Sequence, residues 1–237
     1  MGRGRRNGLI AAALAGAALV GLASLQPAFA IDPFGPSGRV TVTPAASNQF
    51  AGTLDEGTGT REFTTRYGAP PDGGTGAMAI STPDGGDKVQ FVTAEVGGPL
   101  SRFADSSYWA LRDPASHSDA MPSFAIAADV DGGDLQAGDL HVLTYLPDHA
   151  AAGTWTRYDV GSGTFCVTRQ IGRADAYRQC RDGGEQRTLA QIMDEFPQMT
   201  AYAAGFNQGG GDAGLVSAVD LMQVGARTYD LEPDTAR

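Results

Sequence analysis

Glycine and proline recur along the whole chain and divide it into short segments. The sequence has 33 Gly and 13 Pro in 237 residues, close to one residue in five. Both residue types destabilise helix interiors, which argues against a helical bundle or coiled coil. The segments between them are rich in β-branched and aromatic residues, a pattern typical of strands. We expect strands at 39–43, 61–66, 77–81, 88–94, 108–111, 124–131, 140–145, 155–160, 165–171, 201–206, 218–224 and 228–231.

The number and shortness of these segments predict an all-β fold, an antiparallel sandwich of two sheets. The segments at 77–81 and 88–94 flank Pro83-Asp84-Gly85-Gly86, a strong turn signal. We therefore expect these two strands to pair with each other.

One segment has the period of a helix. From Leu189 onward, apolar residues occur at i, i+3, i+4 and i+7. Thr188 precedes the segment and Gln191 follows three residues later, as in a capping box, while Pro197 ends it. We expect a short helix that lies across one end of the sandwich and covers its core.

The first thirty residues resemble a secretory signal. A basic start is followed by an apolar stretch at 9–25 and by Ala28-Phe29-Ala30, a small-x-small cleavage pattern. We expect cleavage after Ala30 and secretion; the alternative is an uncleaved membrane anchor, because the apolar stretch is nearly long enough to span a bilayer. We expect an N-terminal arm or linker at 31–58, the sandwich at 59–233 and a tail at 234–237.

The expected mature chain is strongly acidic. Removal of residues 1–30 leaves 14 basic and 27 acidic side chains, a formal charge of −13. Phosphate backbones repel such a surface, so nucleic acid is not an expected partner. We expect no membrane association after cleavage of the signal.

The chain has two cysteines, Cys166 and Cys180. In an oxidising compartment an even pair predicts one disulfide, here closing a polar loop. A thiol nucleophile is the alternative, but neither cysteine has a histidine near it in the sequence.

Short motifs occur at 70–78, 155–160, 188–192, 205–211, 218–220 and 229–233. They resemble those of secreted bacterial jelly-roll sandwiches. The chain is similar, over about residues 58–233, to concanavalin A-like and galactose-binding-like domains, which include carbohydrate-binding modules. The resemblance implies a jelly-roll fold and, by analogy, glycan binding.

A cluster of acids at Asp129, Asp131 and Asp134 is a candidate Ca²⁺ site. Ca²⁺ prefers six to eight oxygen ligands, and closely spaced carboxylates on a turn supply several. The alternative is a polar turn with solvated acids, because the full calcium-loop pattern is absent. The resemblance also suggests a structural ion between the first and last strands, near Asp55-Glu56 and Asp220.

The aromatic residues Tyr108, Trp109 and Trp155 are the candidate ligand-binding residues, because sugar rings stack on aromatic faces. Neighbours on a strand point to opposite faces, so one of Tyr108 and Trp109 is expected in the core and the other at the surface. The alternative is that both tryptophans are core residues.

These observations lead to three hypotheses. The first is a secreted, non-catalytic binding module for extracellular polysaccharide or a cell-surface glycan, with a structural Ca²⁺ as the only expected cofactor. The second is a cell-surface or matrix interaction protein without a glycan site. The third is a glycan hydrolase or lyase, for which no catalytic residue is predicted.

Overall fold

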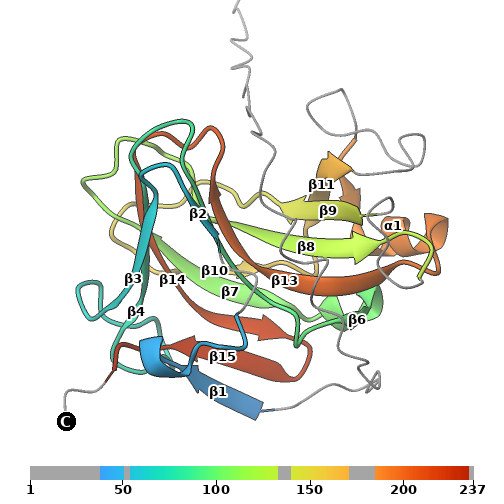
Figure 1. Cartoon of the computed structure of the whole chain (residues 1–237), viewed down its shortest axis with the longest axis horizontal. Helices are drawn as coiled ribbons and strands as arrows, with labels where there is room; N and C mark the ends of the chain where they lie inside the picture. The colour runs from blue at the N-terminus through green and yellow to red at the C-terminus, as the bar shows by residue number, and fades with distance from the viewer. Residues whose placement is uncertain (1–37, 51–53, 133–139, 171–184, 235–237) are drawn as a thin grey trace, which may run out of the picture.

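A computed structural model describes residues 38–50, 54–132, 140–170 and 185–234, with backbone only at 168–170 (Figure 1). The predicted signal peptide lies outside these residues, so its cleavage stays a prediction. In this described part of the chain, fifteen strands form two sheets, largely antiparallel, which confirms the predicted β-sandwich. We call the sheets A and B.

Sheet A has seven strands, in the order β1-β15-β14-β4-β3, with β7 between β14 and β10. Strand β14 is its centre: β7 pairs along one side, and β4 and β15 pair with successive parts of the other. The strands are β1 (Gly38–Val42), β3 (Thr60–Thr64), β4 (Ala77–Thr82), β7 (Ser107–Arg112), β10 (Thr156–Asp159), β14 (Leu215–Val224) and β15 (Arg227–Leu231).

Sheet B has eight strands, in the order β12-β11-β9-β8-β13-β5-β2, with β6 also on β13. The strands are β2 (Leu54–Glu56), β5 (Lys88–Thr93), β6 (Gly98–Pro99), β8 (Ser123–Asp129), β9 (Leu140–Tyr145), β11 (Thr164–Gln170), β12 (Arg187–Thr188) and β13 (Thr200–Gly209). Two 3-10 helices, η2 (Pro44–Ala46) and η3 (Leu100–Phe103), and one α-helix, α1 (Leu189–Glu195), complete the elements of the described chain.

The core between the sheets is rich in aromatic rings. Tyr108 from sheet A stacks on Phe124 of sheet B, with ring centroids 6.0 Å apart, and meets Phe206 edge-on. Such offset and edge-to-face pairs add to the free energy that burial of their area provides. The rings link β7 of one sheet to β8 and β13 of the other.

The predicted hairpin of the strands at 77–81 and 88–94 is wrong. Strand β4 pairs with β3 and β14 in sheet A, whereas β5 pairs with β13 and β2 in sheet B. The turn between them instead carries the chain from one sheet to the other. The carboxylate of Asp87 holds this crossing by accepting hydrogen bonds from the backbone N–H groups of Thr58 and Asp84, both at 2.7 Å.

The part of the predicted N-terminal arm that the structure describes contributes to both sheets. Strand β1 pairs with β15, in parallel, and β2 pairs with β5. Phe50 lies between them, 3% exposed, and stacks on Phe91 with ring centroids 4.1 Å apart.

The predicted helix is confirmed. Thr188 is the N-cap of α1, and its side chain and that of Gln191 form the expected reciprocal hydrogen bonds. Leu189 and Ile192 are buried, and α1 lies at one end of the sandwich (Figure 1). Within the described residues, no helix has the length and apolar character needed to cross a membrane.

Candidate cation site and tryptophan face

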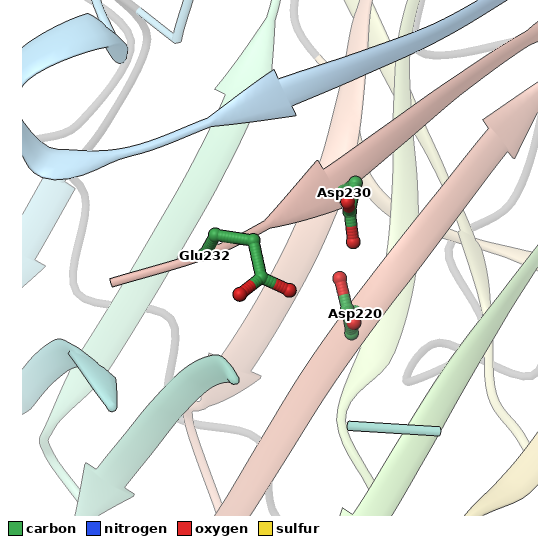
Figure 2. Close-up of side chains that lie close together, drawn as sticks. All are labelled: Asp220, Asp230 and Glu232. Carbon is green, nitrogen blue, oxygen red and sulfur yellow. The ribbon is translucent and has the colours of Figure 1, made fainter. Parts of the chain in front are cut away.

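Three carboxylates meet at the junction of β14 and β15 in sheet A. Asp220 lies on β14, Asp230 on β15, and Glu232 directly follows β15. One carboxylate oxygen from each lies within 4.8 Å of the others. Figure 2 shows Asp220 and Asp230 pointing toward one another, with the Glu232 carboxylate beside them. We call these residues the acidic triad.

Asp220 points away from the core, and a bulge in β14 directly follows it. Val219 and Met222 both belong to the buried core, although strict alternation would separate them. The two residues between them include Leu221, whose φ of +48° is in the left-handed region, and the pairing with β7 is irregular after Asp220. Asp220 therefore lies on the side of sheet A that faces away from sheet B, which we call the outer face.

Asp220 is completely buried but only half satisfied. Its Oδ1 accepts hydrogen bonds from the N–H groups of Leu221 (2.6 Å) and Leu231 (2.7 Å), and its Oδ2 has no partner. Burial raises the pKa of this carboxyl to about 7; the two backbone hydrogen bonds oppose the shift, and repulsion from Asp230 and Glu232 adds to it.

Asp230 is paired on one side only. Its Oδ2 accepts a hydrogen bond from Nε of Arg39 on β1 (3.0 Å) and forms an ion pair with Nη2 of the same guanidinium (2.8 Å). Its Oδ1 is buried and has no partner. Arg39 is therefore the cation that balances part of the negative charge of the acidic triad.

Glu232 is bound by the connection between β3 and β4, which we call loop 65–76. Its carboxylate accepts hydrogen bonds from the N–H of Thr75 (2.9 Å), the hydroxyl of Thr75 (2.8 Å) and the N–H of Gly76 (3.1 Å). Gly74 packs so closely against the Glu232 carboxylate that a Cβ at this position would displace it.

The donors of the acidic triad suit a hard divalent cation. All three are carboxylates, and two of their oxygens, on Asp220 and Asp230, are buried without a partner. Buried polar atoms are usually hydrogen-bonded, and an orphan in a native structure indicates a missing partner. A proton shared between the carboxylates would also reduce their repulsion, which adds to the larger effect of burial in raising the pKa of Asp220.

Trp109 lies beside this site on the outer face of sheet A, and Trp155 directly precedes β10 of the same sheet. Trp109 on β7 is directly opposite Asp220 in the strand register and also opposite Arg157 on β10. Opposite residues share a face. Trp155 precedes Arg157 by two positions, and its Nε1 donates to the carbonyl of Tyr67 in loop 65–76 (3.2 Å). Both indoles are half-buried.

Loop 65–76 is also fixed by a second buried carboxylate, Asp113. Its Oδ2 accepts hydrogen bonds from the hydroxyl of Tyr67 and from Nη2 of Arg66, both at 2.7 Å. The hydrogen bond from Tyr67, followed by one from the N–H of Ala115, holds the pKa of Asp113 below its usual range. Burial and the same carboxylate raise the pKa of Tyr67 to about 12.

The structure separates the three aromatic residues singled out from the sequence. Tyr108 is 0% exposed, and its hydroxyl donates to the carbonyl of Pro122 at 2.5 Å. Its ring is therefore not accessible to a ligand, whereas Trp109 and Trp155 keep part of their surface in solvent. The expected division of Tyr108 and Trp109 between core and surface is present.

The acids at 129–134 form a turn as far as the structure describes them. Asp129 is 1% exposed, and its Oδ1 accepts hydrogen bonds from the N–H groups of Asp131 and Gly132, both at 2.8 Å. Asp134 lies outside the described residues, so the predicted site stays a prediction.

Of the two predicted cysteine partners, the structure describes one. Cys166 is buried on β11. Cys180 lies outside the described residues, and the predicted disulfide stays a prediction.

Sequence reasoning considered Asp220 but gave it the wrong neighbours. Asp55 forms an ion pair with Arg61, and Glu56 lies on β2 of the other sheet. The residues that the structure places beside Asp220 are Asp230 and Glu232. A sequence signal for this exists, because a turn at residues 225–226 pairs β14 with β15 and so places Asp220 opposite the segment that contains Asp230 and Glu232.

Comparisons with known proteins identify no relative: no family, no curated protein and no solved structure matches the chain.

Proposed function

We propose that the chain is a secreted, non-catalytic binding module for extracellular carbohydrate. The observation that carries the proposal is the position of two half-buried indoles: Trp109 lies on the outer face of sheet A, and Trp155 lies directly before β10 and is held by loop 65–76. Rings held in this way provide rigid apolar surface against which the C–H faces of a sugar can pack.

Polar groups for sugar hydroxyls lie beside the indoles. Arg157 is exposed and directly opposite Trp109, and it donates to Asp159 Oδ1 (2.5 Å) and to the hydroxyl of Ser107 (3.0 Å). A guanidinium has five donors and a carboxylate only accepts. The guanidinium of Arg157 can therefore donate to the oxygen of a sugar hydroxyl, and the carboxylate of Asp159 can accept its proton in a hydrogen bond. The jelly-roll resemblance of the sequence agrees with this use of the face.

We further propose that the acidic triad holds a structural Ca²⁺. The two unpartnered buried oxygens support this, together with the excess of three carboxylates over the single guanidinium of Arg39. The ion would join β14, the end of β15 and, through Glu232, loop 65–76. Carboxylate oxygens are the ligands that Ca²⁺ prefers.

A binding screen tests the carbohydrate proposal. Residues 31–237 are incubated with soluble and insoluble polysaccharides, and bound protein is measured for wild type, Trp109→Ala and Trp155→Ala. Tyr202→Ala is the matched control, because Tyr202 is a half-buried aromatic on β13 of the other sheet. We expect binding that both tryptophan variants weaken and the control keeps.

Two results would contradict the proposal. Absence of binding across the panel would favour the cell-surface interaction protein, and release of reducing ends from a bound polysaccharide would favour the glycan hydrolase or lyase. Circular dichroism of each variant shows whether its fold is intact.

Direct titration tests the cation. Isothermal calorimetry of the chelator-treated protein with Ca²⁺ should give one site, which Asp220→Asn or Asp230→Asn weakens. Asp131→Asn is the comparison, because Asp131 belongs to the other candidate Ca²⁺ site predicted from the sequence. A site lost in Asp131→Asn and kept in Asp220→Asn would refute the assignment to the acidic triad.

A further inference from the structure

Loop 65–76 contacts both the acidic triad and the tryptophan face. Near its end, Thr75 and Gly76 donate hydrogen bonds to Glu232. Near its start, the carbonyl of Tyr67 accepts the hydrogen bond of the Trp155 indole. One short segment therefore joins a member of the acidic triad to a residue of the proposed carbohydrate surface.

A second contact ties the middle of the loop to the same site. Arg39, which pairs with Asp230, also donates through Nη1 to the carbonyl of Asp72. Two of the three triad carboxylates are thus connected to the loop, Glu232 directly and Asp230 through Arg39. A change in the geometry of the acidic triad can therefore move the loop through Glu232 and through Arg39.

The acidic triad has a reason to change geometry when a cation binds. Asp220 and Asp230 point toward one another (Figure 2), each has one buried oxygen without a partner, and their negative charges repel. A divalent cation replaces this repulsion by attraction and draws the carboxylates toward a common centre. Glu232 would then be both a ligand of the cation and the clamp of loop 65–76.

We propose that a divalent cation in the acidic triad positions loop 65–76 and, through it, Trp155, so that cation binding controls the tryptophan face. This inference rests on the proposed function, because it assigns a regulator to the same surface. A ligand shifts a conformation only by its difference in affinity between two states, and the coupling is reciprocal. Carbohydrate bound to the face therefore tightens the cation by the same factor by which the cation tightens carbohydrate.

The chain is suited to a direct test, because it contains two tryptophans only. Trp155→Phe leaves Trp109, which is opposite Asp220 and reports on the acidic triad. Trp109→Phe leaves Trp155, which reports on the far end of the loop. Each variant is stripped with EDTA and titrated with Ca²⁺ while tryptophan emission and acrylamide quenching are recorded.

We expect both single-tryptophan proteins to respond, with the same midpoint Ca²⁺ concentration. A response of Trp109 alone would overturn the inference and leave the cation site standing. If neither tryptophan changes its emission or quenching and calorimetry shows no heat of Ca²⁺ binding, both the inference and the cation site are overturned. Neither result bears on carbohydrate binding, which the polysaccharide screen measures separately.

A further variant separates the clamp from the cation. Thr75→Val in the Trp109→Phe background removes the hydroxyl that donates to Glu232 and leaves all three carboxylates in place. We expect its Ca²⁺ titration by calorimetry to change little and the response of Trp155 to fall. Thr60→Val on β3, whose exposed side chain is remote in sequence from the clamp, is the matched control. An unchanged Trp155 response in Thr75→Val would contradict a role of the Thr75 hydroxyl in the clamp.

Carbohydrate binding supplies the last measurement. For a polysaccharide that binds in the screen, the affinity should fall in EDTA and recover in Ca²⁺. It should depend less on Ca²⁺ in Thr75→Val than in wild type. Affinity that is equal in EDTA and Ca²⁺ would overturn the inference while leaving the proposed module intact.

Discussion

Two buried aspartates of sheet A show how hydrogen bonding decides the charge of a carboxylate. Asp113 accepts hydrogen bonds from Tyr67, Ala115 and Arg66, and its pKa is lowered. Asp220 has one oxygen without a partner, and burial raises its pKa to about 7. The first is a stable anion that fixes a loop, and the second requires a counterion or a proton.

Asp113→Asn should reduce the free energy of unfolding at neutral pH. It should also make this free energy decrease less as the pH is lowered. Because the folded-state pKa of Asp113 lies below the unfolded value, its contribution is present above about pH 4 and is lost as pH falls through the folded pKa. Removing one partner of a buried hydrogen bond costs roughly 1–3 kcal/mol. Urea unfolding from pH 7 to pH 2 measures both effects. Asp119→Asn, an exposed carboxylate, is the control; parallel pH profiles for wild type and Asp113→Asn would contradict the prediction.

At the scale of elements, α1 and β1 are attached by different means. The helix has a capping box and two buried apolar residues, Leu189 and Ile192. Strand β1 is at the edge of sheet A, and apart from Val42 its residues are exposed or half-exposed. Its attachment rests on pairing with β15 and on Arg39, which binds Asp230 and loop 65–76.

Thr188→Ala should destabilise the protein by about 1 kcal/mol, because an N-cap hydroxyl satisfies a backbone N–H that the helix itself leaves free. Guanidinium unfolding measures the loss. Ser101→Ala removes an exposed hydroxyl from η3 and serves as the control. Equal unfolding midpoints for Thr188→Ala and the control would show that the cap contributes nothing.

Arg39→Ala should release β1 selectively, because it removes the only guanidinium that the described structure places on Asp230 and leaves that carboxylate buried and unpaired. Hydrogen exchange read by mass spectrometry should show faster exchange in residues 38–42 and little change in β13. Arg61→Ala, which removes a surface ion pair with Asp55, provides the comparison. If β1 and β13 lose protection equally, the effect is global and the prediction fails.

For the whole molecule, the clearest expected effect is stabilisation by Ca²⁺. A ligand that binds only the folded state stabilises it by about 2.7 kcal/mol at one hundred times its dissociation constant. Thermal unfolding in Ca²⁺ should therefore occur at a higher temperature than in EDTA. The difference should shrink in Asp220→Asn and persist in Asp131→Asn; a difference of wild-type size in Asp220→Asn would place the stabilising ion elsewhere.

The sequence was informative where local chemistry decides the structure. The capping box at Thr188 and the strand at 140–145 are present as expected, because each depends on residues near one another in the chain. The pairing of the strands at 77–81 and 88–94 was predicted wrongly, because each finds its partners far away in sequence. The acidic triad was missed for a related reason: its carboxylates meet only once β14 bulges at Leu221 and Glu232 receives loop 65–76.

The parallel pairing of β1 with β15 has a consequence for the order of folding. It joins the beginning of the sandwich to its end, and the bond from Arg39 to Asp230 spans 191 positions. Contacts of such sequence separation slow folding, because a long chain segment must be ordered before they form. A chain that emerges N-terminus first, from a ribosome or across a membrane, must hold residues 38–42 unpaired until residues 227–231 have emerged. Completion of sheet A, and with it of the acidic triad, therefore cannot precede the emergence of residues 227–232.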